Sequence, residues 1–215
     1  MKKSYMLGVL CAFSLNVFSL TANAALVVSN LNETSLGSGG NPLMAMAFTT
    51  DSSNYTLNNI VAPLGEINFA GSMIVSGHLY TDAGSLPGTQ VSNGNLGTVT
   101  FDGFATLDRT FAPTSGTVSL DANTTYWFVL DSSSVSGLLW KDTSSVNEDS
   151  PSPFSWSISD NRAFFNTTSS LWEASPTIHM FSVDATVSSV PVPAAAWLFG
   201  SGLLGLVGVA RRKKA

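Results

Sequence analysis

The stretch that decides the fold is Thr124-Thr125-Tyr126-Trp127-Phe128-Val129-Leu130, a short run without a charged side chain. It is made of β-branched, aromatic and aliphatic residues, which favour strands. A continuous apolar run of this length is typical of a strand that is buried on both faces. We therefore expect residues 124–130 to form an interior strand of an all-β body.

Shorter runs of the same kind recur on both sides of this stretch. Ser and Thr account for 47 of the 166 residues between 25 and 190. Thr favours strands, whereas Gly, Asn and Ser favour turns, and both tendencies count against helices. We predict a single antiparallel β-sandwich, related to the jelly roll, over residues 25–189. The other expected strands are 73–80, 97–101, 104–107, 138–140, 154–158 and 177–183.

Two segments between these runs carry turn or loop signals. Asp102-Gly103 lies between two strand-like runs and predicts a β-hairpin. Residues 141–153 are acidic and contain two prolines, so we expect a long exposed loop there.

The charges are distributed unevenly along the chain. Residues 25–190 contain 14 acidic and three basic residues, a net charge of −11, while the other six basic residues lie near the two ends. Nucleic-acid binding needs clustered cations that displace counterions from phosphates, so the composition excludes this class. The single cysteine, Cys11, lies in the N-terminal segment, so the body has no disulfide.

The N-terminus has the layout of a secretory signal peptide over residues 1–24. Two lysines precede a mostly apolar stretch from 5 to 20, and small residues follow at Ala22 and Ala24. This pattern predicts export and cleavage by signal peptidase between Ala24 and Ala25. The alternative is an uncleaved anchor, but 16 residues interrupted by polar side chains are short for a bilayer.

The C-terminal segment, residues 190–215, has three parts. Val190-Pro191-Val192-Pro193 interrupts regular structure, residues 194–210 are apolar except for Ser201, and the basic cluster ends the segment. This order predicts a transmembrane helix over 194–210, with Trp197 near its outer end and the body outside the cytoplasm. The basic residues, which would stop transfer, are Arg211, Arg212, Lys213 and Lys214.

Residues 190–214 resemble a PEP-CTERM sorting signal, with a Pro-x-Pro element, an apolar helix and a terminal basic cluster in that order. The sorting motif covers Val190, Pro191, Val192, Pro193, Ala194 and Trp197, and Val192 stands where the family usually has Glu. The resemblance implies a Gram-negative bacterium that makes exopolysaccharide, and recognition by the membrane transpeptidase exosortase. It also implies an inner-membrane intermediate with its body in the periplasm, followed by the cell surface or extracellular matrix. The alternative is a tail anchor that is never cut.

The body has a second resemblance, over residues 58–185. The segments 78–82, 84–89 and 120–129 are similar to those of bacterial choice-of-anchor surface domains. This resemblance implies a fold and a location at the cell surface but no activity.

We expect no enzymatic activity from the residues that usually carry catalysis. The body has no cysteine and no Gly-x-Ser-x-Gly motif. His78 and His179 each lie within a strand-like run without metal-ligand spacing, so we expect them to be packed or exposed on a sheet. Most acidic residues lie in turns, which makes a glycan hydrolase the less favoured alternative.

Two sets of residues are candidates for ligand binding. Asp142, Glu148 and Asp149 offer hard oxygens for calcium, and the alternative is a solvated acidic loop; no other cofactor is expected. Trp140, Trp156 and Trp172 could stack on sugar rings, and the alternative is that they belong to the core, as we expect for Trp127. The sequence thus predicts an exported, non-catalytic structural or adhesive protein associated with exopolysaccharide; the alternative is a module that binds this polysaccharide.

Overall fold

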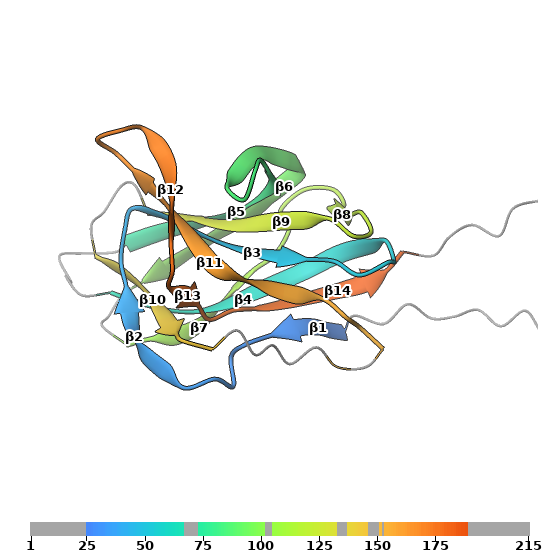
Figure 1. Cartoon of the computed structure of the whole chain (residues 1–215), viewed down its shortest axis with the longest axis horizontal. Helices are drawn as coiled ribbons and strands as arrows, with labels where there is room; N and C mark the ends of the chain where they lie inside the picture. Colours follow the sequence, from blue (N-terminus) through green and yellow to red (C-terminus); the bar gives the residue numbers. More distant parts are fainter. Residues whose placement is uncertain are drawn as a thin grey trace, which may run out of the picture.

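The structure is a computed structural model and describes residues 25–66, 73–101, 105–132, 137–145, 151 and 153–188. In these ranges every regular element is a β-strand, and no helix occurs. The strands form two antiparallel sheets with a shared core between them (Figure 1), which is consistent with a β-sandwich. The prediction of an all-β body is confirmed at this level.

The first sheet has eight strands. Its main path runs β1-β14-β4-β10-β13, while β2 pairs with β10, and β7 and β8 pair with β4. Its strands are β1 (Ala25–Ser29), β2 (Ser35–Gly39), β4 (Tyr55–Glu66), β7 (Leu107–Phe111), β8 (Ser119–Leu120), β10 (Leu138–Thr143), β13 (Ile178–His179) and β14 (Ser182–Val187).

The second sheet has six strands, in the order β12-β11-β3-β9-β5-β6. Neighbouring strands in this order are hydrogen-bonded, so β12 and β6 form its two edges. Its strands are β3 (Leu43–Thr49), β5 (Met73–Asp82), β6 (Pro87–Phe101), β9 (Thr125–Asp131), β11 (Ser157–Asn166) and β12 (Leu171–Ser175).

Strand β9 confirms the expectation of an interior strand over the apolar run 124–130. It lies between β3 and β5, and its register with β3 runs without a bulge from Leu43↔Asp131 to Thr49↔Thr125. Its five central residues are buried. Because side chains alternate along a strand, Phe128 points into the main core while Trp127 packs on the other face of the sheet.

The main core between the sheets is rich in aromatic rings. Trp156 stacks on Phe48 at 5.5 Å with an interplanar angle of 10°, and it meets Tyr55 edge-on at 4.9 Å. Phe128 makes edge-on contacts with Phe111 at 5.4 Å and with Trp140 at 5.6 Å. These contacts join strands of both sheets, so burial of aromatic surface is a major source of stability in this cysteine-free body.

A second, smaller cluster lies on the outer face of the six-stranded sheet. Five buried residues form its centre, and Tyr80, Leu86 and Trp172 pack against them. The Trp127 indole N–H donates a 2.8 Å hydrogen bond to Asp82 at its border. We call this group the outer cluster; its buried members are Ala45, Ala47, Trp127, Val129 and Ala163.

The predicted Asp102-Gly103 hairpin is wrong. Strand β6 pairs with β5 in the six-stranded sheet, whereas β7 pairs with β4 in the other sheet. Residues 102–104 lie outside the described part of the chain. Burial of Phe111 against Phe128, on the opposite sheet, outweighs the local turn preference, so the chain changes sheets here.

Predicted boundaries are wrong in other segments as well. Lys141–Thr143 belong to β10, so the acidic loop begins later than expected. The strand predicted over 154–158 begins only at Ser157. The single strand predicted over 177–183 is divided into β13 and β14, since residues 180 and 181 turn aside to make hydrogen bonds outside the ladders.

Both boundaries of the described body lie at one end of the sandwich. Strand β1 starts at Ala25, which pairs with Ala185 near the end of β14. Strands β2, β10, β12 and β13 gather at the opposite end (Figure 1). We call these the terminal end and the distal end.

Candidate functional site

The distal end brings together three ionisable side chains that are far apart in the sequence. Asp142 comes from β10, Arg162 from β11 and His179 from β13. The His179 Nδ1 atom lies 2.5 Å from Asp142 Oδ1, and an Arg162 terminal nitrogen lies 2.9 Å from His179 Nε2. The same nitrogen is 4.0 Å from Asp142 Oδ1. We call these residues the Asp–His–Arg cluster.

Strand register explains why these residues meet. Asp142 is the direct partner of His179 in the β10–β13 pair. Arg162 belongs to the other sheet, where it is paired with Met46 of β3. The contact of Arg162 with His179 therefore connects the two sheets at the distal end.

The centre of the cluster is shielded from water. His179 is 0% exposed, while the side chains of Asp142 and Arg162 are 15% and 12% exposed. The His179 ring stacks on Trp140 with centroids 4.4 Å apart and an interplanar angle of 4°. Trp140 is held in turn by a 2.7 Å hydrogen bond from its indole N–H to the Met180 carbonyl.

The partners of His179 determine its tautomer. A guanidinium only donates hydrogen bonds, so His179 Nε2 must accept from Arg162 and carry no proton. The ring proton of the neutral form is then on Nδ1, which faces the Asp142 carboxylate. Burial lowers the pKa of His179 below its ordinary value; the Asp142 carboxylate opposes this effect, and the Arg162 charge adds to it.

Asn30, which follows β1, completes the polar network behind the histidine. Its side-chain N–H donates to the His179 carbonyl at 3.1 Å, and its side-chain oxygen accepts from the Phe181 N–H at 2.7 Å. The backbone N–H of Asn30 donates to the Phe181 carbonyl at 3.1 Å. One buried amide thus satisfies the backbone where β13 and β14 are separated.

The geometry of His179 is that of a structural link. A general base needs a ring nitrogen that can reach a reacting proton, but Nε2 is enclosed and already accepts from Arg162. The other histidine, His78, is half-buried on β5; burial lowers its pKa, and Asp131 opposes that effect. Both histidines lie on or in a sheet, as expected, but no motif in the sequence indicates the charged partners of His179.

Of the three predicted calcium ligands, the structure describes only Asp142. The Asp142 carboxylate lies against His179 and faces the Arg162 guanidinium, so it already has charged neighbours of its own. Glu148 and Asp149 lie outside the described residues. Within the described ranges, no group of three His, Cys, Asp or Glu side chains is placed to hold a metal ion.

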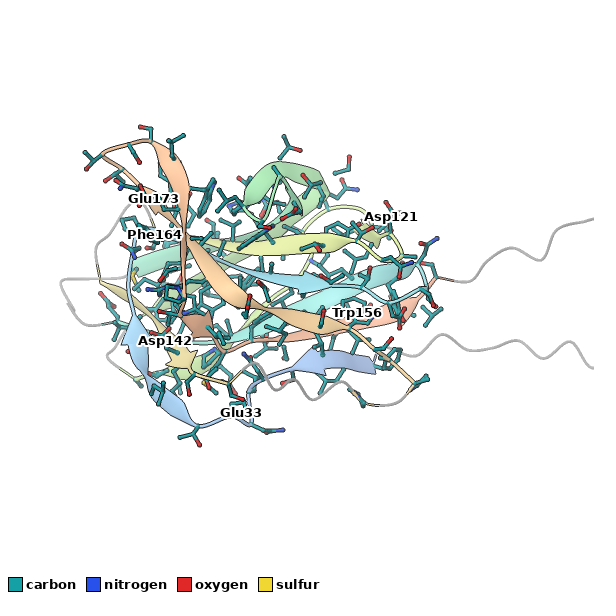
Figure 2. The ribbon with its side chains drawn as sticks, viewed as in Figure 1. Glu33, Asp121, Asp142, Trp156, Phe164 and Glu173 are labelled. Carbon is teal, nitrogen blue, oxygen red and sulfur yellow. The ribbon has the colours of Figure 1, made fainter. Side chains whose placement is uncertain are left out.

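The three candidate tryptophans have different environments. Trp140 and Trp156 are buried in the main core, so the alternative of core residues holds for both, and neither offers a ring to a sugar. Trp156 lies between the sheets in Figure 2. Trp172 is only partly buried and meets Phe165 edge-on at 5.6 Å.

The aromatic pair Phe165–Trp172 belongs to the β11–β12 hairpin, which projects from the distal end (Figures 1 and 2). Its turn is held by side chains, because Asn166 donates to Glu173 at 2.7 Å and accepts from the Thr168 N–H at 2.9 Å. Leu171, beside the pair, is 64% exposed. The hairpin therefore presents apolar and polar groups together on a well-defined turn.

The residues of the predicted processing signals lie almost entirely outside the described ranges. Only Ala25, the first residue of β1, is described; residues 1–24 and 190–215 are not. Among the described residues, the structure has no helix of the length and apolarity needed to cross a membrane. No protein-family model matches the chain, and comparisons with curated proteins and with solved structures found no match.

Proposed function

We propose that this chain is an exported protein that is sorted to the cell surface or extracellular matrix, where it has a structural or adhesive role rather than a catalytic one. The observation that carries the proposal is the segment 190–214, in which a Pro-x-Pro element, an apolar stretch and a basic cluster follow one another. An exosortase-type transpeptidase would recognise this segment after signal peptidase has removed residues 1–24.

The first and last described strands are placed in keeping with this proposal. Strand β1 covers Ala25–Ser29, and Ala25 is both the first residue that the structure describes and the residue after the predicted cleavage site. Strand β14 ends at Val187, three residues before the sorting motif begins. Neither processing event would therefore remove a strand that the structure describes. Since β1 starts and β14 ends at the terminal end, a body held through its C-terminus would point its distal end outward.

The composition and topology of the body are also in keeping with an exported module. It has no cysteine, and its two sheets share a core rich in aromatic and aliphatic side chains. We infer that the sandwich is a relative of the jelly roll. Its first and last described strands are neighbours in one sheet, and between β2 and β13 the chain passes repeatedly from one sheet to the other.

The proposal is tested in the cells that make the protein, by fractionation and intact-mass analysis. We expect a surface or matrix product that starts at Ala25 and lacks the end of the 190–215 segment. The double variant Pro191→Ala/Pro193→Ala should accumulate as a membrane-bound precursor. The matched control Pro151→Ala/Pro153→Ala should be processed normally. A cytoplasmic product that retains residues 1–24, or a surface product with an intact C-terminus, would contradict the proposal.

The Phe165–Trp172 pair favours a second candidate function, which is binding of the exopolysaccharide. Sugar rings stack on partly exposed aromatic rings, and Asn166 and Glu173 place polar groups beside this pair. We would titrate the protein with exopolysaccharide from its own host, first with calcium and then with a chelator. Trp172→Ala should abolish binding, while the control Leu171→Ala, at an exposed neighbour, should retain it. Equal binding by Trp172→Ala and the unmodified protein would reject this function.

A further inference from the structure

We propose that the Asp–His–Arg cluster is an acid-sensitive latch between the two sheets, closed while His179 is neutral and opened when it is protonated. The latch is independent of the export proposal. It rests on the contacts of His179 Nδ1 with Asp142 and of Nε2 with Arg162, and on the complete burial of the ring.

Among the described residues, the charged groups that face His179 come from two strands. Strand β10 contributes Asp142 and β11 contributes Arg162. Lys141, also on β10, contributes its backbone carbonyl, which accepts from the Met180 N–H at 2.9 Å. The remaining neighbours, Met46 of β3 and Asn30, do not titrate. The charged groups that face the ring are therefore one carboxylate and one guanidinium, and the Lys141 backbone also acts to raise the pKa of His179.

Protonation of the ring breaks one of its two contacts and strengthens the other. A proton added at Nε2 places an N–H opposite the Arg162 guanidinium, so two donors and two positive charges would meet 2.9 Å apart. The imidazolium keeps its Nδ1–H facing the Asp142 carboxylate, and the two groups now carry opposite charges. Arg162 is the partner that must leave, and its side chain is partly exposed, which gives it a route to solvent.

Departure of Arg162 loosens the attachment of β11 to the other sheet. The register of β11 with β3 is interrupted between Ile158 and Arg162, so the ladder is irregular next to the latch. Strand β11 therefore depends on side-chain contacts such as the one from Arg162 to His179 at this point. Protonation would also change the ring that stacks on Trp140 from a neutral imidazole to a charged imidazolium.

The pH range follows from the direction of the shift. The pKa of folded His179 lies below 6.5, its value in an unfolded chain. Well above pH 6.5, His179 is neutral in both the folded and the unfolded chain, and the latch contributes fully to stability. As the pH falls from 6.5 to the lowered pKa, the unfolded chain binds the proton first, so the contribution is progressively lost.

The experiment is a pH titration of the ¹⁵N-labelled full-length protein by long-range ¹H–¹⁵N NMR, which distinguishes imidazole tautomers. The chain has only two histidines, so His78→Gln assigns the signals. We expect the Nδ1–H tautomer of His179 at about pH 7.5 and a midpoint below pH 6.5. Trp140 emission should fall with the same midpoint, because the imidazolium stacked on it quenches fluorescence, and Trp140→Phe should remove this change.

Variants separate a latch from a simple packing role. Arg162→Met should move the His179 midpoint to higher pH, because the opposing charge is gone while Asp142 remains. Asp142→Asn should move it to lower pH. His179→Gln should remove the acid-dependent change in Trp140 emission.

Three results would overturn the proposal. The first is an Nε2–H or charged His179 at about pH 7.5, which the unmodified protein reveals without any variant. The second is an unchanged midpoint in Arg162→Met. The third is an acid-dependent change in Trp140 emission that persists in His179→Gln.

Discussion

Asn30→Ala should be one of the most destabilising single substitutions at the polar sites of this protein. The side chain of Asn30 satisfies two buried backbone groups, the His179 carbonyl and the Phe181 N–H, at 3.1 and 2.7 Å. Alanine removes both contacts but leaves the backbone in place. A buried backbone group without a partner costs about 1–3 kcal/mol. Alanine also removes the cost of burying the amide itself, so we expect a net loss of about 2–4 kcal/mol in the free energy of unfolding.

The assay is equilibrium unfolding in urea at about pH 7.5, followed by tryptophan fluorescence. The midpoint should fall while the dependence of the free energy on urea stays the same, because the surface exposed on unfolding is nearly unchanged. Asn58→Ala is the matched control. Asn58 bonds to the side chain of Thr186, at 2.9 and 3.2 Å, and this partner can turn to water. We expect a loss of about 1 kcal/mol or less for the control. If Asn30→Ala costs no more than Asn58→Ala, the reasoning is refuted.

Three further predictions concern the core. In the described structure, both carboxylate oxygens of Glu66 are buried without a hydrogen-bond partner, and the residue is 2% exposed. Glu66→Met should therefore raise the free energy of unfolding by about 1–3 kcal/mol. A lower melting temperature of this variant in calorimetry would contradict the prediction. A Cβ added at Gly77 would collide with the ring of Phe111, so Gly77→Ala should lower the free energy of unfolding by about 1–3 kcal/mol. An unchanged urea midpoint would show that the core repacks around the added methyl group. Trp127→Phe keeps a ring in the outer cluster but loses the 2.8 Å hydrogen bond to Asp82. The free energy of unfolding should fall by about 1–2 kcal/mol in the same assay. An unchanged free energy would mean that water takes the place of the indole N–H as the partner of Asp82.

The fold class could be predicted from the sequence because its signals are local. The run 124–130 became β9, a strand buried on both faces, since continuous apolar side chains suit the middle of a sheet with a cover on each side. The hairpin predicted at Asp102-Gly103 was wrong because a non-local contact outweighs a local preference there. A turn preference acts over a few residues, whereas the burial of Phe111 against the other sheet is decided by the whole fold.

The polar site could not be predicted from the sequence. Asp142, Arg162 and His179 have no characteristic spacing, and strand register and sheet packing alone bring them together. Trp140 and Trp172 show the same limit for burial. Both follow a leucine in a strand, but β10 is covered by the opposite sheet, whereas β12 is an edge strand. Composition therefore indicates which residues are suited to a core, whereas the topology of the sheets determines which of them are exposed to solvent.

The position of β14 has a mechanical consequence. This last strand lies between β1 and β4, and it is hydrogen-bonded to both. Antiparallel hydrogen bonds run perpendicular to the strands, so a pull on the chain beyond Ser188 acts along β14 and across its bonds. Such a load shears the rows of bonds together, rather than peeling them apart one at a time. The sandwich is thus arranged so that tension applied through its C-terminus is shared by the ladders on both sides of β14.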